Sequence, residues 1–429
     1  MRGERAGKSI RDPLWSSIAI DDLALGLVDT AAFQRLRYVR QLGLAFLVYP
    51  GATHSRFEHA LGAYHLARRT LRMLEEAGEL GRVAPEECAI VRAAALLHDV
   101  GHYPFSHALE EIGAPRHESV AQPILTRGEV ADKLRRIAPD APSRVHALIR
   151  GDSASPLQGL ISGSLDLDKI EYLKRDALMC GVPYGEIDVD RLLASLTLLE
   201  HPESGALVVG VREKGLSALE SLLFAKYQMY RNVYWHHAVR SATAMYKRLV
   251  NDALRAGVVT GDELASFTDE GLLHRLEERA MSPLLGSLRS RRLYKRALEC
   301  PASDLEEGCA EWVATDHPLT RRVENRLAEE LGLEPGALLL DFPEKPQMLG
   351  LDIPVRRKDG SARQLTATGW PGAIDLPALS DELYRSTRWL RVFTSRPITI
   401  NREALIALAR HAPSDVAARL DSGKSLLSG

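Results

Sequence analysis

Three short stretches of the chain place imidazole and carboxylate groups where we expect helices to begin or end. His98 and Asp99 end a segment that is otherwise almost wholly apolar. His59 stands near the start of a helical segment after a Pro-Gly-Ala turn, and Asp168 opens another helical segment. Polar or ionised groups beside a dry core are costly unless they are paired or coordinated. A bound metal ion would supply the partner that His98 and Asp99 need.

The types of these side chains narrow the choice of metal. A mixed set of imidazole and carboxylate ligands suits one divalent ion of Mn, Mg, Fe, Co or Ni better than a thiolate-preferring ion. An alternative stays open for the dipeptide taken alone: His98 would cap a helix C-terminus and Asp99 would accept a turn hydrogen bond. A His-Asp pair arises often by chance, so the surrounding sequence has to decide.

Further histidines follow the first pair along the chain. His102 and His107 come directly after Asp99, and His117 follows a Gly-Ala-Pro turn, with Glu110 between them. An imidazole has an unperturbed pKa of about 6.5, so it can donate or accept a proton near neutral pH. Each of these histidines could equally be a side chain bonded to backbone. Their closeness to the predicted metal site favours a chemical role.

The elements that position these groups are predicted to be helices. Leu, Ala, Arg and Glu dominate the first three quarters of the chain, and apolar residues recur every three or four positions. The clearest helix covers residues 86–99, with Pro85 at its start and Gly101 just past its end. Further helices are expected at residues 61–77, 167–179, 216–250 and 263–280.

Beyond about residue 320 the pattern changes to one helix followed by short β-like runs. The expected helix covers residues 319–331, and the expected strands cover residues 337–341, 351–356, 362–366 and 389–394, with a turn at residues 358–361. We therefore predict a mainly α protein with a helical domain over residues 1–320 and a small α/β subdomain over residues 321–429.

Composition excludes several classes of protein. Lys and Arg total 55 against 57 Asp and Glu, so no overall positive field favours nucleic acid as a partner. The charged start of the sequence lacks the apolar core of a signal peptide, and the longest apolar run is far shorter than the roughly 20 residues that span a bilayer. The four cysteines are scattered, which argues against a zinc ribbon or a disulfide framework. We expect a cytoplasmic protein with no membrane partner.

Several stretches around these groups match, in order, the pattern of one known family. They are residues 33–37 (FQRLR), 41–43 (QLG), 49–59 (YPGATHSRFEH), 96–107 (LLHDVGHYPFSH), 117–118 (HE) and 165–176 (LDLDKIEYLKRD). With these stretches the chain resembles the HD-domain phosphohydrolase superfamily over about residues 12–250, and within it the deoxynucleoside triphosphate triphosphohydrolase branch. The resemblance implies the helical HD-domain fold.

The resemblance also implies which residues hold the metal and move protons. It assigns the metal ligands as His59, His98, Asp99 and Asp168. Four ligands leave coordination positions open for water or a phosphate oxygen, as a catalytic site requires. It further implies that His107 donates a proton to the leaving oxygen with Glu110 orienting it, and that His102 and His117 bind phosphate oxygens. Glu110 stands where a member of the branch has an aspartate, so the reach of the carboxylate differs from that enzyme's.

Substrate contacts are implied in the same way. On one helical face, Asp168, Tyr172 and Asp176 recur every four residues, and the last two match positions at the deoxyribose. Ordinary core packing would explain Tyr172 nearly as well. An amphipathic core helix would likewise explain the aromatic residues Tyr230 and Tyr234. The resemblance further implies that Lys226 binds phosphate and that Gln41, Leu42 and Tyr234 lie at the sugar. Helical spacing adds Arg56, on the face of His59, as a second phosphate contact and places Tyr230 on the face of Lys226 and Tyr234. Lys169 is a further candidate substrate contact.

The reaction implied by the resemblance is attack of water on the α-phosphorus of a deoxynucleoside triphosphate, releasing a deoxynucleoside and inorganic triphosphate. Two alternatives remain open. A phosphohydrolase on the same scaffold could remove phosphates stepwise from nucleotides or nucleotide analogues, and a regulatory protein could bind nucleotides with little turnover. Members of the branch form oligomers, so the resemblance also implies a homo-oligomer.

Overall fold

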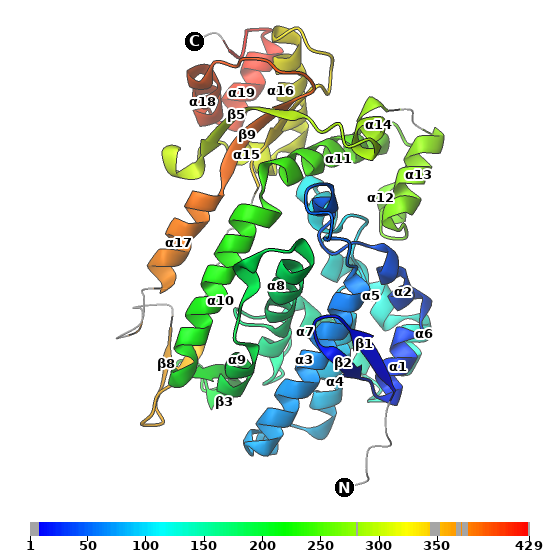
Figure 1. The fold of residues 1–429 in the computed structure, drawn as a ribbon, viewed down its shortest axis with the longest axis vertical. Coiled ribbons are helices and arrows are strands. Elements are labelled where there is room, and N and C mark those ends of the chain that lie inside the picture. The colour runs from blue at the N-terminus through cyan, green and yellow to red at the C-terminus, as the bar shows by residue number, and fades with distance from the viewer. Residues whose placement is uncertain (1–7, 280–281, 344–351, 366–369, 371–375, 428–429) are drawn as a thin grey trace.

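The computed structural model describes residues 8–279, 282–343, 352–365, 370 and 376–427, and within them the protein is mainly α-helical, as predicted (Figure 1). The helices of the larger, N-terminal part are α1 Asp22–Val28, α2 Ala31–Gln34, α3 Arg56–Glu76, α4 Pro85–Leu97, α5 His117–Thr126, α6 Gly128–Leu134, α7 Ala141–Arg150, α8 Leu167–Cys180, α9 Val189–Ser195, α10 Leu216–Met229, α11 His237–Arg255, α12 Gly261–Leu264, α13 Asp269–Arg279 and α14 Pro283–Arg289. The remaining helices are α15 Glu311–Thr315, α16 His317–Glu330, α17 Leu376–Thr387, α18 Arg402–Arg410 and α19 Pro413–Asp421.

Three small sheets accompany the helices. Their strands are β1 Ser9–Asp12, β2 Ser16–Ala19, β3 Leu196–Glu200, β4 Leu207–Arg212, β5 Lys295–Pro301, β6 Leu338–Asp341, β7 Pro354–Arg356, β8 Ala362–Gln364 and β9 Trp389–Thr394. The first sheet is the hairpin β1-β2, the second has the order β3-β4-β7-β8, and the third has the order β5-β9-β6. All pairs are antiparallel except β4 with β7.

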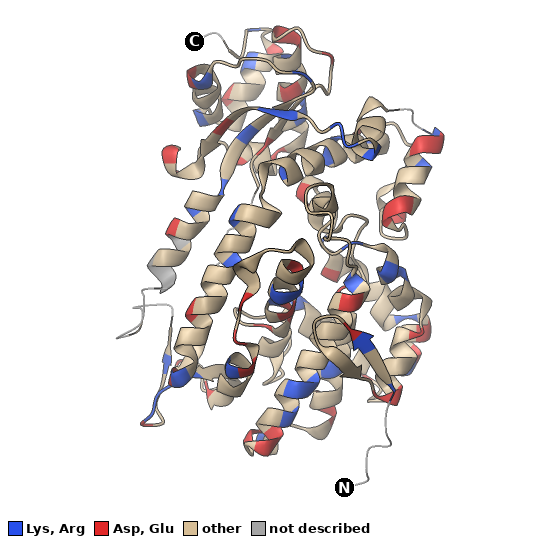
Figure 2. Cartoon of the chain, in the orientation of Figure 1, with Lys and Arg blue, Asp and Glu red and all other residues tan. Residues whose placement is uncertain are grey.

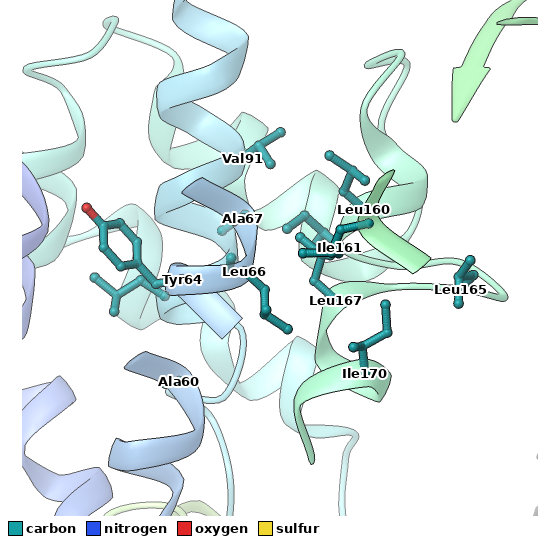
Figure 3. Packing of buried hydrophobic residues seen from close by; sticks show 14 of the residues in the cluster. Ala60, Tyr64, Leu66, Ala67, Val91, Leu160, Ile161, Leu165, Leu167 and Ile170 are labelled. Carbon is teal, nitrogen blue, oxygen red and sulfur yellow. The ribbon is translucent and has the colours of Figure 1, made fainter. Parts of the chain in front are cut away.

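Helix α3 packs against both α4 and α8 in the larger part. Helix α3 begins with a capping box, in which the hydroxyl of Ser55 and the carboxylate of Glu58 satisfy backbone N–H groups at the helix start. Helix α4 has proline at its first turn and is apolar almost all round, so it is buried along most of its length. Figure 3 shows side chains of α3, α4 and the segment around the start of α8 meeting in one apolar core.

The long helix expected at residues 216–250 is broken in the structure. Helix α10 ends at Met229, a π-helical turn η8 (Tyr230–Tyr234) follows, and α11 begins at His237. The break has local causes, because the N–H of Trp235 bonds to the carbonyl of Tyr230 and the His236 side chain caps the start of α11. The helix expected at residues 263–280 is also interrupted, between α12 and α13, and residue 280 lies outside the described residues.

The C-terminal sheet also differs from the prediction, because it takes a strand from before residue 320. Strand β5 pairs with β9, and Leu298, Cys300, Leu390 and Val392 of these strands lie in a second apolar core with residues of α16, α18 and α19 (Figure 1). Strands β7 and β8 instead join β3 and β4 beside the first core. The boundary at residue 320 therefore stays a proposal, and the sheet pairing favours a boundary near the start of β5. Parts of two expected strands, residues 351 and 366, lie outside the described residues.

Lys and Arg residues and Asp and Glu residues are spread over both parts of the protein (Figure 2). This distribution fits the net charge of −2. Among the described residues, no helix combines the length and apolar character that crossing a bilayer requires.

Candidate active site

Three helices bring the predicted ligands together in one group, which we call the metal cluster: His59, His98, Asp99 and Asp168. His59 comes from the first turn of α3, and His98 directly follows α4. The Nε2 atoms of His59 and His98 are 3.1 Å apart. Oδ1 of Asp168 lies 2.9 Å from Nε2 of His59 and 3.5 Å from Nε2 of His98. Oδ1 of Asp99 lies 3.3 Å from Nε2 of His98.

The Nδ1 atoms of His59 and His98, which face away from the centre of the metal cluster, both have hydrogen-bond acceptors. Nδ1 of His59 donates to Oε2 of Glu171 over 2.6 Å, and Nδ1 of His98 donates to the carbonyl of Ala95 over 2.9 Å. When a metal ion is bound, protons on Nδ1 of both rings would leave the lone pairs of both Nε2 atoms directed at the ion, beside the Asp99 and Asp168 carboxylates. Metal-binding histidines are oriented by this kind of second hydrogen bond, so the donor set fits one divalent metal ion.

Charge in the metal cluster also favours a cation. Burial alone would raise the pKa of Asp168, but the His59 and His98 imidazoles hold it well below its usual range. Burial would likewise raise the pKa of Asp99, whereas the Arg56 guanidinium and the neighbouring imidazoles hold it far below normal. Both carboxylates are therefore ionised at neutral pH and present negative charge to the same small volume.

The guanidinium of Arg56 is hydrogen-bonded to the metal cluster and to a neighbouring serine. Its Nη1 donates to Oδ2 of Asp99 over 2.6 Å, and its Nε donates to the hydroxyl of Ser106 over 3.1 Å. The side chain is only 3% exposed. This geometry assigns Arg56 to neutralising and orienting Asp99, in addition to the phosphate contact expected from the sequence.

A second group, the histidine cluster, consists of His102, His107, Glu110 and His117. His107 and Glu110 lie on the 3-10 helix η4 (Ser106–Ile112), and His117 starts α5. Nδ1 of His107 is 3.1 Å from one carboxylate oxygen of Glu110, and Nδ1 of His117 is 2.7 Å from the other. The rings of His102 and His117 stack with their centroids 3.7 Å apart. Burial alone would raise the pKa of Glu110, but the two imidazoles hold it well below its usual range.

His102 joins the two clusters. Its Nε2 lies 3.1 Å from Oδ1 of Asp99, and its Nδ1 is buried with no hydrogen-bond partner in the described part of the chain. Burial and the Arg56 guanidinium hold the pKa of His102 well below its usual value, so the ring is neutral. A neutral ring with its proton directed at Asp99 offers Nδ1 as an acceptor. The expected contact of His102 with a phosphate oxygen stays a prediction.

Four of the residues expected near the sugar come from α8 and from η8, the turn that follows α10. Both oxygens of the buried Asp176 are bound: Oδ2 accepts from the hydroxyl of Tyr234 and Oδ1 pairs with Nε2 of His54, each over 2.7 Å. The rings of Tyr172 and Tyr234 have centroids 6.3 Å apart, and Tyr230 packs edge-on against Tyr234. The structure therefore brings Tyr172, Asp176, Tyr230 and Tyr234 into one group.

The other expected substrate contacts differ in their surroundings. Lys169 is engaged at the start of its own helix, where its ammonium donates to the carbonyl of Gly163 and to the carboxylate of Asp166. Lys226 is buried in the last turn of α10. Gln41 is buried with its side-chain carbonyl unpartnered among the described residues, and Leu42 packs partly buried against two apolar clusters.

Sequence reasoning missed three residues that shape the site: Glu171, His54 and Asp269. Glu171 follows Asp168 by three residues on α8, so a shared helical face could have indicated its position. Nothing in the sequence joins His54 to Asp176, because 122 residues separate them. Asp269 is buried and accepts hydrogen bonds from the backbone of Phe105 and Arg40, and no local pattern marks it.

Comparison with known proteins places these clusters in a family. The HD domain model matches residues 56–157, and the model of the HD associated region matches residues 187–368. An uncharacterized protein of Methanocaldococcus jannaschii is 34% identical over 361 residues, which are 83% of this chain and 73% of that protein.

Two further proteins are similar over most of the chain. The deoxynucleoside triphosphate triphosphohydrolase SAMHD1 homolog of Dictyostelium discoideum is 28% identical over 68% of this chain, which spans 60% of that protein. The crystal structure of a phosphohydrolase from Bacteroides thetaiotaomicron shares the fold with a TM-score of 0.70 and 22% identity, over 91% of this chain and 100% of the other. The match to the HD domain begins at Arg56 and includes every residue of the two clusters except Asp168. The family match and these relatives support a general role as a phosphohydrolase. The chain belongs to the HD-domain family, with an HD domain followed by an HD associated region.

Proposed function

We propose that the protein hydrolyses deoxynucleoside triphosphates to a deoxynucleoside and inorganic triphosphate, with one divalent metal ion held by the metal cluster. The observation that carries this proposal is the meeting of the two clusters at Asp99. One oxygen of Asp99 lies 3.3 Å from Nε2 of His98 and 3.1 Å from Nε2 of His102. A phosphate bound at the metal cluster would therefore reach the histidine cluster as well.

The residues of the metal cluster would hold the ion, and the ion would supply Lewis acidity and a site for a water or hydroxide. Nδ1 of His102 is the unpartnered acceptor at the junction of the clusters, so it would accept a hydrogen bond from the attacking water. His117, fixed by Glu110 through Nδ1, would present Nε2 to a phosphate oxygen. These contacts orient the water and the α-phosphorus for in-line attack.

His107 would complete the reaction. Its Nδ1 faces Glu110, which leaves Nε2 as the atom that exchanges a proton with the substrate. The attacking water forms a bond to the α-phosphorus, the bond from that phosphorus to the 5' oxygen breaks, and the 5' oxygen takes a proton from His107. The proton of the water passes to solvent or to a basic group of the cluster, so charge and protons balance.

The choice of a deoxyribose substrate rests on the group around Asp176. Tyr172 and Tyr234 flank a carboxylate whose oxygens are already bound by Tyr234 and His54, so the group is rigid. A rigid sugar site discriminates against an added hydroxyl by steric exclusion or by leaving it unpaired. The name of the D. discoideum relative, a deoxynucleoside triphosphate triphosphohydrolase homolog, supports the same substrate class.

The test is product analysis. Purified protein is incubated with each of the four deoxynucleoside and four ribonucleoside triphosphates, with Mn, Mg, Fe, Co or Ni in turn, and products are separated by ion-pair chromatography. We expect deoxynucleoside and triphosphate, lost in Asp168→Ala. Successive diphosphate and monophosphate would replace this proposal with stepwise phosphate removal. Tight nucleotide binding without turnover under any metal would favour a regulatory role.

A further inference from the structure

The loop between the two clusters has a backbone conformation that its residues do not favour. Phe105 has φ of 58° and Ser106 has φ of 64°, so two consecutive residues other than glycine lie in the left-handed region. Side chains with a Cβ atom crowd the carbonyl oxygen in this region, and such residues persist where surrounding structure holds them. Both residues are buried, and they lie directly before His107.

Asp269, the first residue of α13, holds this turn from a distant part of the chain. Its Oδ1 accepts the N–H of Phe105 over 2.7 Å, and its Oδ2 accepts the N–H of Arg40 over 3.0 Å. The guanidinium of Arg40 lies 3.4 Å from Oδ2. The side chain is 2% exposed, so water cannot readily replace either contact.

The two contacts join three segments that carry site residues. Arg40 precedes Gln41, whose carbonyl accepts the hydroxyl of Ser106 over 2.9 Å. Arg35 strengthens the same junction, because its guanidinium donates to the carbonyl of Phe267 over 2.8 Å and to the carbonyl of His102 over 2.6 Å. Hydrogen bonds therefore connect the start of α13 and the segment before it to His102 and to Phe105, the two ends of the loop between the clusters.

We infer that Asp269 is a positioning residue of the histidine cluster: by accepting the N–H of Phe105 it holds the left-handed turn that directs η4, and with it His107 and Glu110, toward the metal cluster. The inference rests on the proposed function for its effect on catalysis. Burial raises the pKa of Asp269 to about 6, so the side chain is mostly ionised at neutral pH and can accept both N–H groups.

The test is the isosteric variant Asp269→Asn, which keeps the size of the side chain but has only one accepting oxygen, with an amide facing the second N–H group. We expect kcat to fall by about 100-fold, because small displacements of catalytic groups have costs of this size. KM and the amount of bound metal should not change. Amide hydrogen exchange in residues 100–107 should accelerate by about tenfold while exchange in α3 stays as in the wild type.

The neighbouring variant Glu270→Gln is the matched control, since Glu270 is 61% exposed and its removal should leave kcat and exchange unchanged. If Asp269→Asn does not fold, Arg35→Lys tests the same junction, with faster exchange expected at residues 100–104 and a smaller loss of kcat. A variant with lower thermal stability but wild-type kcat and exchange would overturn the inference and leave Asp269 a structural residue. If the wild type hydrolyses no nucleotide, the proposed function fails, while the exchange measurement still decides the inference about the loop.

Discussion

The metal cluster and the histidine cluster meet at Asp99 but differ in how their imidazoles are fixed. In the metal cluster each ring is held on its outer nitrogen by a different acceptor, the carboxylate of Glu171 for His59 and a backbone carbonyl for His98. In the histidine cluster a single carboxylate, Glu110, holds both His107 and His117. The His59 side chain is fully buried, whereas that of His107 is 52% exposed.

The difference matches two kinds of chemical work. A metal ligand has to keep one geometry throughout the reaction, so rigid helices and separate second hydrogen bonds suit it. A proton donor has to reach the substrate and exchange protons with solvent, so an exposed position on the short helix η4 suits it. The clusters should therefore respond differently when a single residue is changed: the first should lose metal, and the second should keep metal and lose turnover.

The largest effect is expected from removing a ligand in the metal cluster. In His98→Ala we expect loss of bound metal and a fall in activity of about 1,000-fold, because a metal ion contributes several kcal/mol to the transition state. Metal content by elemental analysis and initial rates check this. His274→Ala is the control, since that side chain is 69% exposed on α13. Full activity in metal-free His98→Ala would contradict the assignment of the ligand.

The histidine cluster should show the opposite pattern. In His107→Asn we expect kcat to fall by about 100-fold or more, the usual range for a general acid, while bound metal stays at the wild-type level. The measurement is the ratio of kcat to metal content, with His98→Ala as the comparison. Loss of metal in His107→Asn would mean that the two clusters act as one metal site, and the comparison between them would fail.

A smaller effect is expected from the acceptor behind His59. Glu171→Gln keeps a hydrogen bond to Nδ1 possible but removes its charge, and such changes typically cost about 10- to 100-fold in metal affinity. Titration with the activating metal should show this loss, and excess metal should restore kcat. Glu171 also pairs with the buried Arg175, so thermal stability of the metal-loaded variant has to be recorded alongside. Unchanged metal affinity would show that the backbone of α3 alone orients His59.

The sequence indicated which side chains would lie together in the metal cluster, because each of them lies at a helix end in a short recognisable stretch; that they bind a metal stays a prediction. Glu171 was not predicted although it stands in the same stretch as Asp168. Glutamate side chains on helices usually face solvent, whereas Glu171 is buried. His54 and Asp269 could not be found, since their partners lie more than a hundred residues away and only tertiary packing joins them.

Elements with local sequence signals were predicted correctly, whereas breaks and distant strand pairs were not. Helix α4 agrees with the expected residues 86–99 to within two residues, because its proline start and its apolar pattern are local signals. The break between α10 and α11 depends on hydrogen bonds of Tyr230 and His236 that the helical periodicity does not reveal. Strand β5 lies in a segment expected to be helical, and its partner β9 is distant in the chain. Periodicity predicts elements, but it does not predict such distant pairing.

The smallest effect is expected at Lys169, which sequence reasoning placed at the substrate. Its ammonium bonds to Gly163 and Asp166 in the structure, so Lys169→Met should lower kcat/KM by no more than about threefold and stability by about 0.5–1 kcal/mol, the range of a partly exposed ion pair.

Lys226→Met is the matched variant, since Lys226 is the other lysine predicted to contact the substrate, there at phosphate. Loss of one charge-assisted contact there should lower kcat/KM by about tenfold or more. A large loss in Lys169→Met with an unchanged free energy of unfolding would show that Lys169 leaves Asp166 to bind the substrate. The comparison would then extend to a third element, the start of α8, which would move when substrate binds.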